Sequence, residues 1–305
     1  MQCDACRREA VIYQPYSGKH LCPAHFLRDF EAKAKHTIRS NGWLHPGDHI
    51  AVALSGNAAG AALLVFLKDL TANRRDIRLS AITIDTGISS CPDLMQAQKT
   101  AAACGVEWFP CSFAERYGTT MDALVQRDGP QAARCACRVL RDDLLGEIAR
   151  AHGVTRCAFA TTVDDSAGKF FSDLLSGTVE RTLFPPGMMG KTRIPGIRPF
   201  MDIPEPEVIL YAGLRSGETI SCNTLPPGPC AGSVSVDADV RAALDTYARR
   251  HPATKFALAN LAGTLAGIAA ARGPPLSCPA CGEPAVGGEC EACHIRRTVE
   301  RGTES

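Results

Sequence analysis

Residues 49–70 read HIAVALSGNAAGAALLVFLKDL. The apolar run Ile50–Leu54 predicts a buried strand, and the leucines that follow the small residues recur at helical spacing. The turn between them begins with Ser55-Gly56. A helix N-terminus carries unsatisfied N–H groups and a partial positive charge, so this turn is suited to hold a phosphate. An ordinary strand-to-helix turn has the same pattern, and no Gly-Lys-Ser/Thr follows to make it a Walker loop.

Three further apolar segments predict strands of the same sheet. They are residues 79–84, 106–111 and 156–161, and a helix over 139–152 precedes the last of them. Strands that alternate with helices predict a doubly wound parallel α/β sheet of Rossmann-like type, whose ligands bind beyond the carboxyl ends of the strands. The turn at Ser55, the Asp85-Thr86-Gly87 stretch and residues 161–165 are therefore expected to face one pocket.

The composition is that of a globular protein. The chain has 305 residues, of which 45% are hydrophobic and 21% charged, with a formal net charge of +1. One or two domains are expected, and any contact with nucleic acid must come from a local basic patch because the net charge is so small. No apolar run approaches the roughly 18 residues of a membrane span, and the start MQCDACRREA lacks the apolar core of a signal peptide. We expect a cytoplasmic protein without membrane contact.

Fifteen cysteines are many for such a chain. In a reducing compartment they indicate metal binding or catalysis before disulfides. Four of them show no regular spacing, and we interpret most of these as core or surface residues without a role. These four are Cys91, Cys104, Cys111 and Cys157.

Two groups of cysteines have the paired spacing of zinc ligands. A C-x-x-C turn places two thiolates on one side of a loop, and a second pair completes a tetrahedron. Four ligands leave no open position, so both sites are predicted to be structural zinc sites; chance cysteines or a redox pair are the alternatives. The ligand sets are Cys3, Cys6, Cys22 and His25 near the N-terminus, and Cys278, Cys281, Cys290 and Cys293 near the C-terminus.

The two cysteine groups flank a larger central region. We predict a zinc module with a linker helix over residues 1–40, an α/β domain with a helical C-terminal part over 41–272, and a second zinc module over 273–305. Apolar residues at helical spacing precede the second module, and Pro252 marks a break between two helices there.

Several motifs taken together resemble a known family. In order they are the first cysteine group, TIDTGI, CACRVLRDDLL, ATTVDDSAGKFFSDLLSG, RIPGIRPFMDIPEPEVILYA and the final pair of C-x-x-C turns. This order resembles, nearly end to end, the tRNA 2-thiouridine synthetases of the TtuA/TtcA group, and the two zinc modules are similar to the TtuA-like branch. The resemblance implies a PP-loop ATP pyrophosphatase that adenylates a tRNA uridine with ATP and magnesium. Sulfur then replaces the uridine oxygen, and three cysteines hold a 4Fe-4S cluster.

The nucleotide loop departs from the family pattern SGGxDS. Residues 55–60 read SGNAAG, which keeps the first two residues and loses the Asp and the last Ser. Backbone amides remain, but the carboxylate that helps to place magnesium and the hydroxyl that binds pyrophosphate are absent, and each loss is expected to slow the reaction. The resemblance assigns nucleotide binding to Ser55, Gly56, Asn57, Asp85 and Gly87.

The family cysteines are also altered. Alignment on Cys137 puts Arg141 at the family's basic position and Arg134 where the first cysteine belongs, while Cys135 lies one residue closer. Cys230 matches the third family cysteine by its distance from His251-Pro252, and Cys222 is the rival. Cys135, Cys137 and Cys230 are candidate ligands of a cluster, and a persulfide-carrying dithiol or inert thiols are the other interpretations.

The family motif G-H-N-x-D-D here reads ATTVDD over residues 160–165. Asp165 matches the catalytic acid/base of relatives, although it also suits the N-cap of a helix that begins near Ser166. The basic residues Lys191, Arg193 and Arg198 suit either phosphate contacts or a solvated face.

The sequence therefore predicts an ATP-dependent tRNA thiolation protein. One alternative is a degenerate paralogue that binds tRNA, nucleotide or a thiolation partner without turnover, and another is an enzyme that transfers sulfur to a different substrate. The partners that the resemblance implies are tRNA, a ubiquitin-like or other sulfur-carrier protein, and a second copy in a homodimer.

Overall fold

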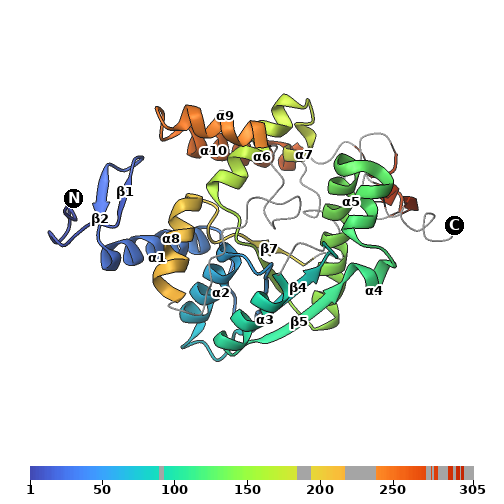
Figure 1. The fold of residues 1–305 in the computed structure, drawn as a ribbon, viewed down its shortest axis with the longest axis horizontal. Helices are drawn as coiled ribbons and strands as arrows, with labels where there is room; N and C mark the ends of the chain where they lie inside the picture. The colour runs from blue at the N-terminus through green and yellow to red at the C-terminus, as the bar shows by residue number, and fades with distance from the viewer. Residues whose placement is uncertain are drawn as a thin grey trace.

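The computed structural model describes residues 1–88, 93–183, 194–216 and 238–272, with short pieces at 276, 278–280, 288–290, 293–295 and 297–298. Its centre is a five-stranded sheet in the order β5-β4-β3-β6-β7, in which all neighbouring strands are parallel (Figure 1). This confirms the predicted α/β fold. The strands are β3 (His49–Ala53), β4 (Arg78–Asp85), β5 (Glu107–Ser112), β6 (Arg156–Ala158) and β7 (Gly196–Ile197).

Helices cover both faces of this sheet (Figure 1). On one face lie α1 (Pro23–Ser40), α2 (Ala58–Thr71), α3 (Asp93–Cys104) and α8 (Glu205–Ser216). On the other lie α4 (Phe113–Tyr117) and α5 (Met121–Ala151). The predicted helix over 139–152 is thus the second half of α5, which is interrupted at Gly129, where φ is 78°.

Alternation along β3 divides the core into two parts. Ile50 and Val52 join the cluster formed with α1, α2 and α8, whereas Ala51 faces the cluster formed with α5. Because successive side chains of a strand point to opposite faces, a strand buried on both sides reads as a continuous apolar run. This is why Ile50–Leu54 could be identified as a strand from sequence.

The strand order creates a crevice at the carboxyl edge of the sheet. From β3 the chain moves outward through β4 and β5, then returns to pair β6 on the other side of β3. In such sheets the two adjacent crossovers leave on opposite faces, and ligands bind between the carboxyl ends of the two strands where the order reverses. That position lies between the ends of β3 and β6.

A group of helices beyond the sheet edge comes from the later part of the chain. It contains α6 (Val163–Leu175), α7 (Glu180–Leu183), α9 (Ala238–Ala248) and α10 (Thr254–Arg272), with α6 packed against α10 (Figure 1). In α10 the window Thr254–Ala271 has a mean hydropathy of 1.2 and only 6% of it is buried. By length and composition it could cross a membrane, so the expectation that no apolar run reaches this length was wrong.

The N-terminal hairpin is tied to this framework through a buried carboxylate. The hairpin consists of β1 (Ile12–Gln14) and β2 (Lys19–Leu21). Tyr16 donates a hydrogen bond of 2.5 Å to Glu207, which is 2% exposed and also lies 3.2 Å from Lys33. The Tyr16 ring lies 4.9 Å from Phe256 of α10, measured between centroids. The hairpin therefore contacts α1, α8 and α10.

We predict that Phe30→Ala lowers the free energy of unfolding by about 3–5 kcal/mol, because it removes a fully buried ring from a close-packed core. Phe30 stacks on Tyr211 at 4.1 Å and meets Phe200 edge-on at 5.0 Å. Urea unfolding of the two proteins measures the change. Tyr13→Ala, which removes a ring that is 51% exposed, is the control; equal effects of the two substitutions would contradict the prediction.

Candidate functional site

The turn after β3 is partly closed by its own side chain. Gly56 has φ 77°, and Asn57 caps α2 by accepting a hydrogen bond of 2.8 Å from the Gly60 amide. A side chain at Gly60 would place its Cβ 3.1 Å from Asn57 Oδ1, so glycine allows this close approach. Among the described residues no acceptor contacts the amides of Ala58 and Ala59. Two donors at the positive end of α2 thus remain for an anion.

The stretch after β4 joins this strand to α5. Asp85 Oδ1 accepts a hydrogen bond of 2.8 Å from the Gly87 amide, and Met121 N donates to Thr86 O at 2.7 Å. Gly87 has φ 71°, and a Cβ there would lie 2.7 Å from Thr120 Cβ. Both predicted nucleotide-binding residues therefore have clear structural roles at this turn.

A capping box begins α6 at the end of β6. The hydroxyl of Thr162 accepts from Asp165 N at 3.2 Å, and Asp165 Oδ2 accepts from Thr162 N at 2.9 Å. The helix starts at Val163, so the predicted start near Ser166 was three residues late and Asp165 occupies its third position. Burial raises the pKa of Asp165, with nearby Glu205 adding to the effect, while the hydrogen bonds from Thr162 and the charge of Arg241 oppose it.

Both carboxylates of the Asp164-Asp165 pair are held by cations from the C-terminal helices. Asp164 lies 2.5 Å from Lys255 of α10, and Asp165 lies 3.3 Å from Arg241 of α9. Asp164 also accepts a hydrogen bond of 2.6 Å from the amide of Glu205. These contacts fix α9 and α10 to the end of β6. A magnesium ion that bound these two carboxylates would have to displace Lys255 and Arg241 from them.

Helix α5 carries the predicted cysteine and its basic neighbour. The helix runs back toward the start of β6, so its first half lies near the carboxyl edge of the sheet. Cys137 is buried in the cluster on the α5 face of the sheet, and Arg141, which is half-buried, follows one turn later on the same side of the helix. The side chain of Cys135 lies outside the described residues, as do Cys222 and Cys230. The cluster ligands therefore stay a prediction.

Arg198 is a site residue whose environment the sequence did not reveal. It directly follows β7, and its guanidinium lies 5.7 Å from the centre of the Phe159 ring at the end of β6. Burial lowers the pKa of Arg198, while Asp142 of α5 opposes this shift. Arg198 is partly buried, and both interpretations made from sequence, phosphate contact and a solvated face, stay open for it. Lys191 and Arg193 lie outside the described residues.

The N-terminal cysteine group has the geometry of a metal site. Its four ligand atoms lie within 4.8 Å of one another: Cys6 Sγ is 3.6 Å from Cys22 Sγ, and His25 Nδ1 is 3.3 Å from Cys22 Sγ. A zinc–sulfur bond of about 2.3 Å gives sulfur–sulfur edges of about 3.8 Å in a tetrahedron, close to these separations. A hydrogen bond from Arg8 is the main cause that lowers the pKa of Cys6 to about 7, which favours the thiolate that binds metal.

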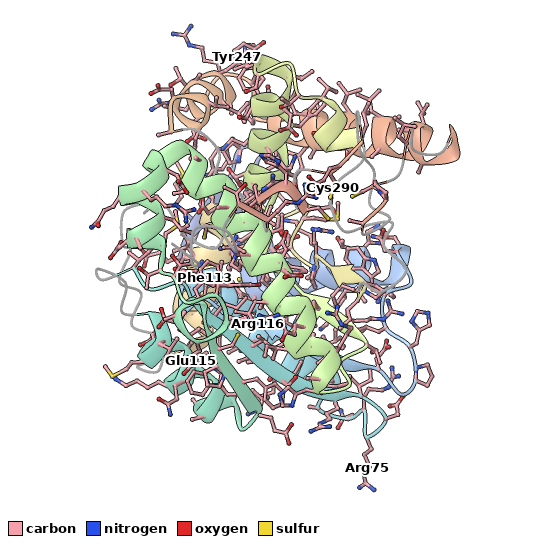
Figure 2. The ribbon with its side chains drawn as sticks, turned by 90° about the vertical axis from the view of Figure 1, so that its right-hand side faces the viewer. Arg75, Phe113, Glu115, Arg116, Tyr247 and Cys290 are labelled. Atoms are coloured by element: carbon pink, nitrogen blue, oxygen red, sulfur yellow. The ribbon has the colours of Figure 1, made fainter. Side chains whose placement is uncertain are left out.

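The C-terminal group is assembled in the same way. Cys278, Cys290 and Cys293 place their sulfurs within 4.8 Å of one another, and Cys281 lies outside the described residues. Ile295 packs against the α5 side of the core. Figure 2 places Cys290 on the same side of the molecule as α4, where Glu115 and Arg116 are labelled. The group therefore lies on the α5 side of the molecule, with Ile295 in contact with the core.

Comparison with known proteins identifies the family. Residues 2–27 match the N-terminal LIM domain of the 2-thiouridine synthetase TtuA, and residues 26–217, more than half of the chain, match the PP-loop domain. The tRNA 2-thiolation protein NcsA of Haloferax volcanii is 27% identical over 98% of this chain and 99% of its own. The cytoplasmic tRNA 2-thiolation protein 1 of Mus musculus is 30% identical over 98% of this chain and 73% of its own. The chain belongs to the PP-loop tRNA 2-thiolation proteins.

A solved structure of this family has the same fold. The U34-tRNA thiolase NcsA from Methanococcus maripaludis, determined with its 4Fe-4S cluster, aligns with a TM-score of 0.79 at 22% identity and covers 98% of this chain and 96% of its own. The resemblance stated from the sequence motifs is thereby confirmed.

We predict that Gly87→Ala destabilises the protein by about 1–3 kcal/mol more than Gly105→Ala does. Both glycines have a positive φ, of 71° and 62°, but only the Cβ at residue 87 meets another atom within 4 Å. Both variants suffer the backbone strain of a positive φ, so the difference between them measures the clash with Thr120. The expected size of this difference is the usual cost of overpacking. Thermal unfolding followed by calorimetry measures both, and equal effects would show that the Thr120 contact does not constrain this turn.

We also predict that Lys255→Met lowers the free energy of unfolding by about 3 kcal/mol, because it leaves the buried Asp164 carboxylate without its cation. Arg74→Met is the matched control, since Arg74 pairs with Asp76 on the surface, where both side chains are 41% exposed, and should cost less than about 1 kcal/mol. Denaturant unfolding gives both values. A similar small effect of both variants would mean that the α10 contact contributes little to stability.

Proposed function

We propose that this protein is a tRNA 2-thiolation enzyme, which replaces the 2-oxygen of a tRNA uridine with sulfur. The observation that carries the proposal is the match to the archaeal 2-thiolation protein along 98% of the chain. The cysteine group at the N-terminus, the PP-loop domain and the two cysteines of CAC on α5 occur in the family order.

The proposed reaction begins with activation of the uridine carbonyl. The uridine oxygen would attack the α-phosphorus of ATP and release pyrophosphate, so that AMP rather than hydroxide leaves when sulfur attacks the ring carbon. The free amides of Ala58 and Ala59 and the positive end of α2 are suited to bind a phosphate of ATP. Arg198, which follows β7 at the same edge, adds positive charge there, and Arg141 of α5 stays the candidate for the family's basic position. Without the family's loop carboxylate, magnesium has one ligand fewer, and we expect slow activation.

The sulfur step is assigned to thiols on α5 and beyond. We propose that Cys135, Cys137 and Cys230 hold a 4Fe-4S cluster, which when bound would supply the site that delivers sulfur. Cys137 is buried against apolar side chains on the α5 face, which would exclude water from a group bound there. Asp165 stays our candidate for the acid/base, because it lies at the end of β6 and burial raises its pKa above that of a free carboxyl.

The metals of the two terminal groups are proposed to be zinc. Three thiolates and an imidazole in the N-terminal group, and three described thiolates in the C-terminal group, suit tetrahedral Zn²⁺. With Cys281 as its fourth ligand, the second site would also have no open position, which indicates a structural role for both. Removal of a structural zinc is expected to unfold its module. A ubiquitin-like or other sulfur carrier, a homodimer and a cytoplasmic location are further proposals that rest on the family relationship.

A second candidate function is favoured by three contacts of the site itself. Asn57 occupies one amide of the phosphate-binding turn, and Asp164 and Asp165 are already held by cations of α9 and α10. Because these groups already bind one another, they are less available to ATP and magnesium. This suits a protein that binds tRNA or nucleotide without turnover. The same assay distinguishes the two functions.

The test uses the full chain purified without oxygen and incubated with tRNA, ATP, magnesium and a sulfide donor. Thiolation predicts 2-thiouridine in the digested tRNA by mass spectrometry, release of AMP, and about two zinc and about four iron atoms per chain. Cys137→Ser should abolish 2-thiouridine and retain zinc, because its thiol belongs to neither terminal group.

Cys104→Ser is the matched control, since Cys104 is buried in α3 and belongs to neither metal group. It should keep both product and metals. A protein that binds tRNA but forms neither 2-thiouridine nor AMP, and holds zinc without iron, would contradict thiolation and support the non-catalytic function.

A further inference from the structure

The C-terminal end of α9 combines an exposed aromatic ring with positive charge. The α9 end patch consists of Tyr247, Arg249, Arg250 and His251. Tyr247 is 57% exposed and lies at the end of the molecule opposite Arg75 in Figure 2. Because the net charge of the chain is only +1, a local patch of this kind is what contact with nucleic acid requires.

The ring of Tyr247 is held in place from one side. It stacks on His251 with 4.5 Å between the ring centres and 29° between the ring planes. The carbonyl of Tyr247 accepts from the amides of Arg250 and His251 at 3.1 and 3.2 Å, which fixes the turn at the end of α9. A fixed ring with one covered face and more than half of its surface exposed presents its other face to a base.

The positive charges of the patch are not neutralised by carboxylates of the described residues. Arg249 donates to the hydroxyl of Thr246 at 3.1 Å, and neither Arg249 nor Arg250 pairs with an acid there. The nearby Asp245 lies 2.5 Å from Lys255, which it shares with Asp164, and it forms no ion pair with either arginine. Both guanidinium groups remain available for phosphate oxygens, for which arginine geometry is well suited.

The patch is joined to the strand-end site by a short, rigid element. Arg241 of α9 contacts Asp165 at the end of β6, and Tyr247 lies six residues further along the same helix. Six residues span about 9 Å of helix axis. A tRNA whose uridine enters the crevice would therefore pass close to this end of α9.

We propose that the α9 end patch is a tRNA-binding surface, on which Arg249 and Arg250 contact backbone phosphates and Tyr247 stacks on an unpaired base. This inference rests on the proposed function, since it supposes a tRNA at the site. It names the surface that positions the tRNA outside the crevice. The neighbouring α10 could suggest a lipid surface instead, but residues 256–271 contain no charged residue, whereas interfacial helices carry a basic face.

The test measures binding of the full chain to unfractionated tRNA between about 50 and 200 mM KCl, the range in which phosphate contacts are most evident. Arg249→Ala/Arg250→Ala should weaken binding about tenfold and reduce the slope of log K against log salt by about 2, because each lost phosphate contact removes about 0.9 of the slope in duplex regions. Tyr247→Ala should weaken binding about tenfold and Tyr247→Phe should retain it, because stacking needs only the ring.

Arg74→Ala/Arg75→Ala is the matched control, because it removes the same charge at the other end of the molecule (Figure 2). It should leave affinity and slope unchanged, and thermal unfolding should confirm that every variant is folded. Equal effects of the two double variants, or none, would overturn the inference. A third outcome would also overturn it: the Arg249/Arg250 variant no longer binds phosphatidylserine vesicles but binds tRNA as the wild type does. That result would indicate a membrane surface.

A separate readout keeps this inference distinct from the proposed function. If the wild-type chain binds tRNA through the patch but forms no 2-thiouridine, the surface is supported and thiolation fails. If 2-thiouridine forms and the Tyr247 and Arg249/Arg250 variants bind tRNA like the wild type, thiolation is supported and the surface is wrong.

Discussion

The charges of Asp164 and Asp165 constrain how the rest of the molecule is assembled. Both carboxylates lie at the end of β6, nearly buried, and a buried carboxylate is costly unless it is paired. Lys255 and Arg241 supply the opposite charges from α10 and α9. The C-terminal helices must therefore lie over the carboxyl edge of the sheet, next to the crevice where the strand order reverses. The fold thus places residues far apart in sequence around one site.

The turn after β3 is one point where this chain departs from the family pattern. Asn57 uses its side chain to cap α2, so the helix end is stabilised from within the protein. As a result, the Gly60 amide donates to Asn57 and is not available to a phosphate. The remaining donors, together with Arg198 over the Phe159 ring, still give the crevice a positive character. These groups suit the binding of an anion, whereas the turn lacks the carboxylate that would help to place magnesium.

Local patterns in the sequence predicted much of the framework. Four of the five strands follow from apolar runs, and the metal groups follow from ligand spacing, because both signals depend on residues close in sequence. Strand β7 has two residues and no apolar run of its own, so it could not be recognised. The start of α6 was missed because Asp165 serves the capping box from inside the helix. The apolar segment of α10 was overlooked because its many alanines and glycines keep its mean hydropathy low.

The ion pairs could not be predicted, because they join residues 76 and 91 positions apart. Nothing in the composition around Arg241 or Lys255 marks them as partners of the strand-end acids. For the same reason Arg198 was interpreted only as a basic residue. Its neighbour Phe159 comes alongside through the pairing of β6 with β7, and the charge of Asp142 acts on it from α5.

The central claim is that this chain thiolates tRNA through its α5 cysteines. It is tested most directly by the 2-thiouridine content of tRNA from a host strain that lacks its own 2-thiolation gene and carries this chain instead. Mass spectrometry of the nucleosides should show 2-thiouridine restored by the wild-type chain and absent with Cys137→Ser at equal protein level. No 2-thiouridine with the wild type, or equal amounts with both, would contradict the account.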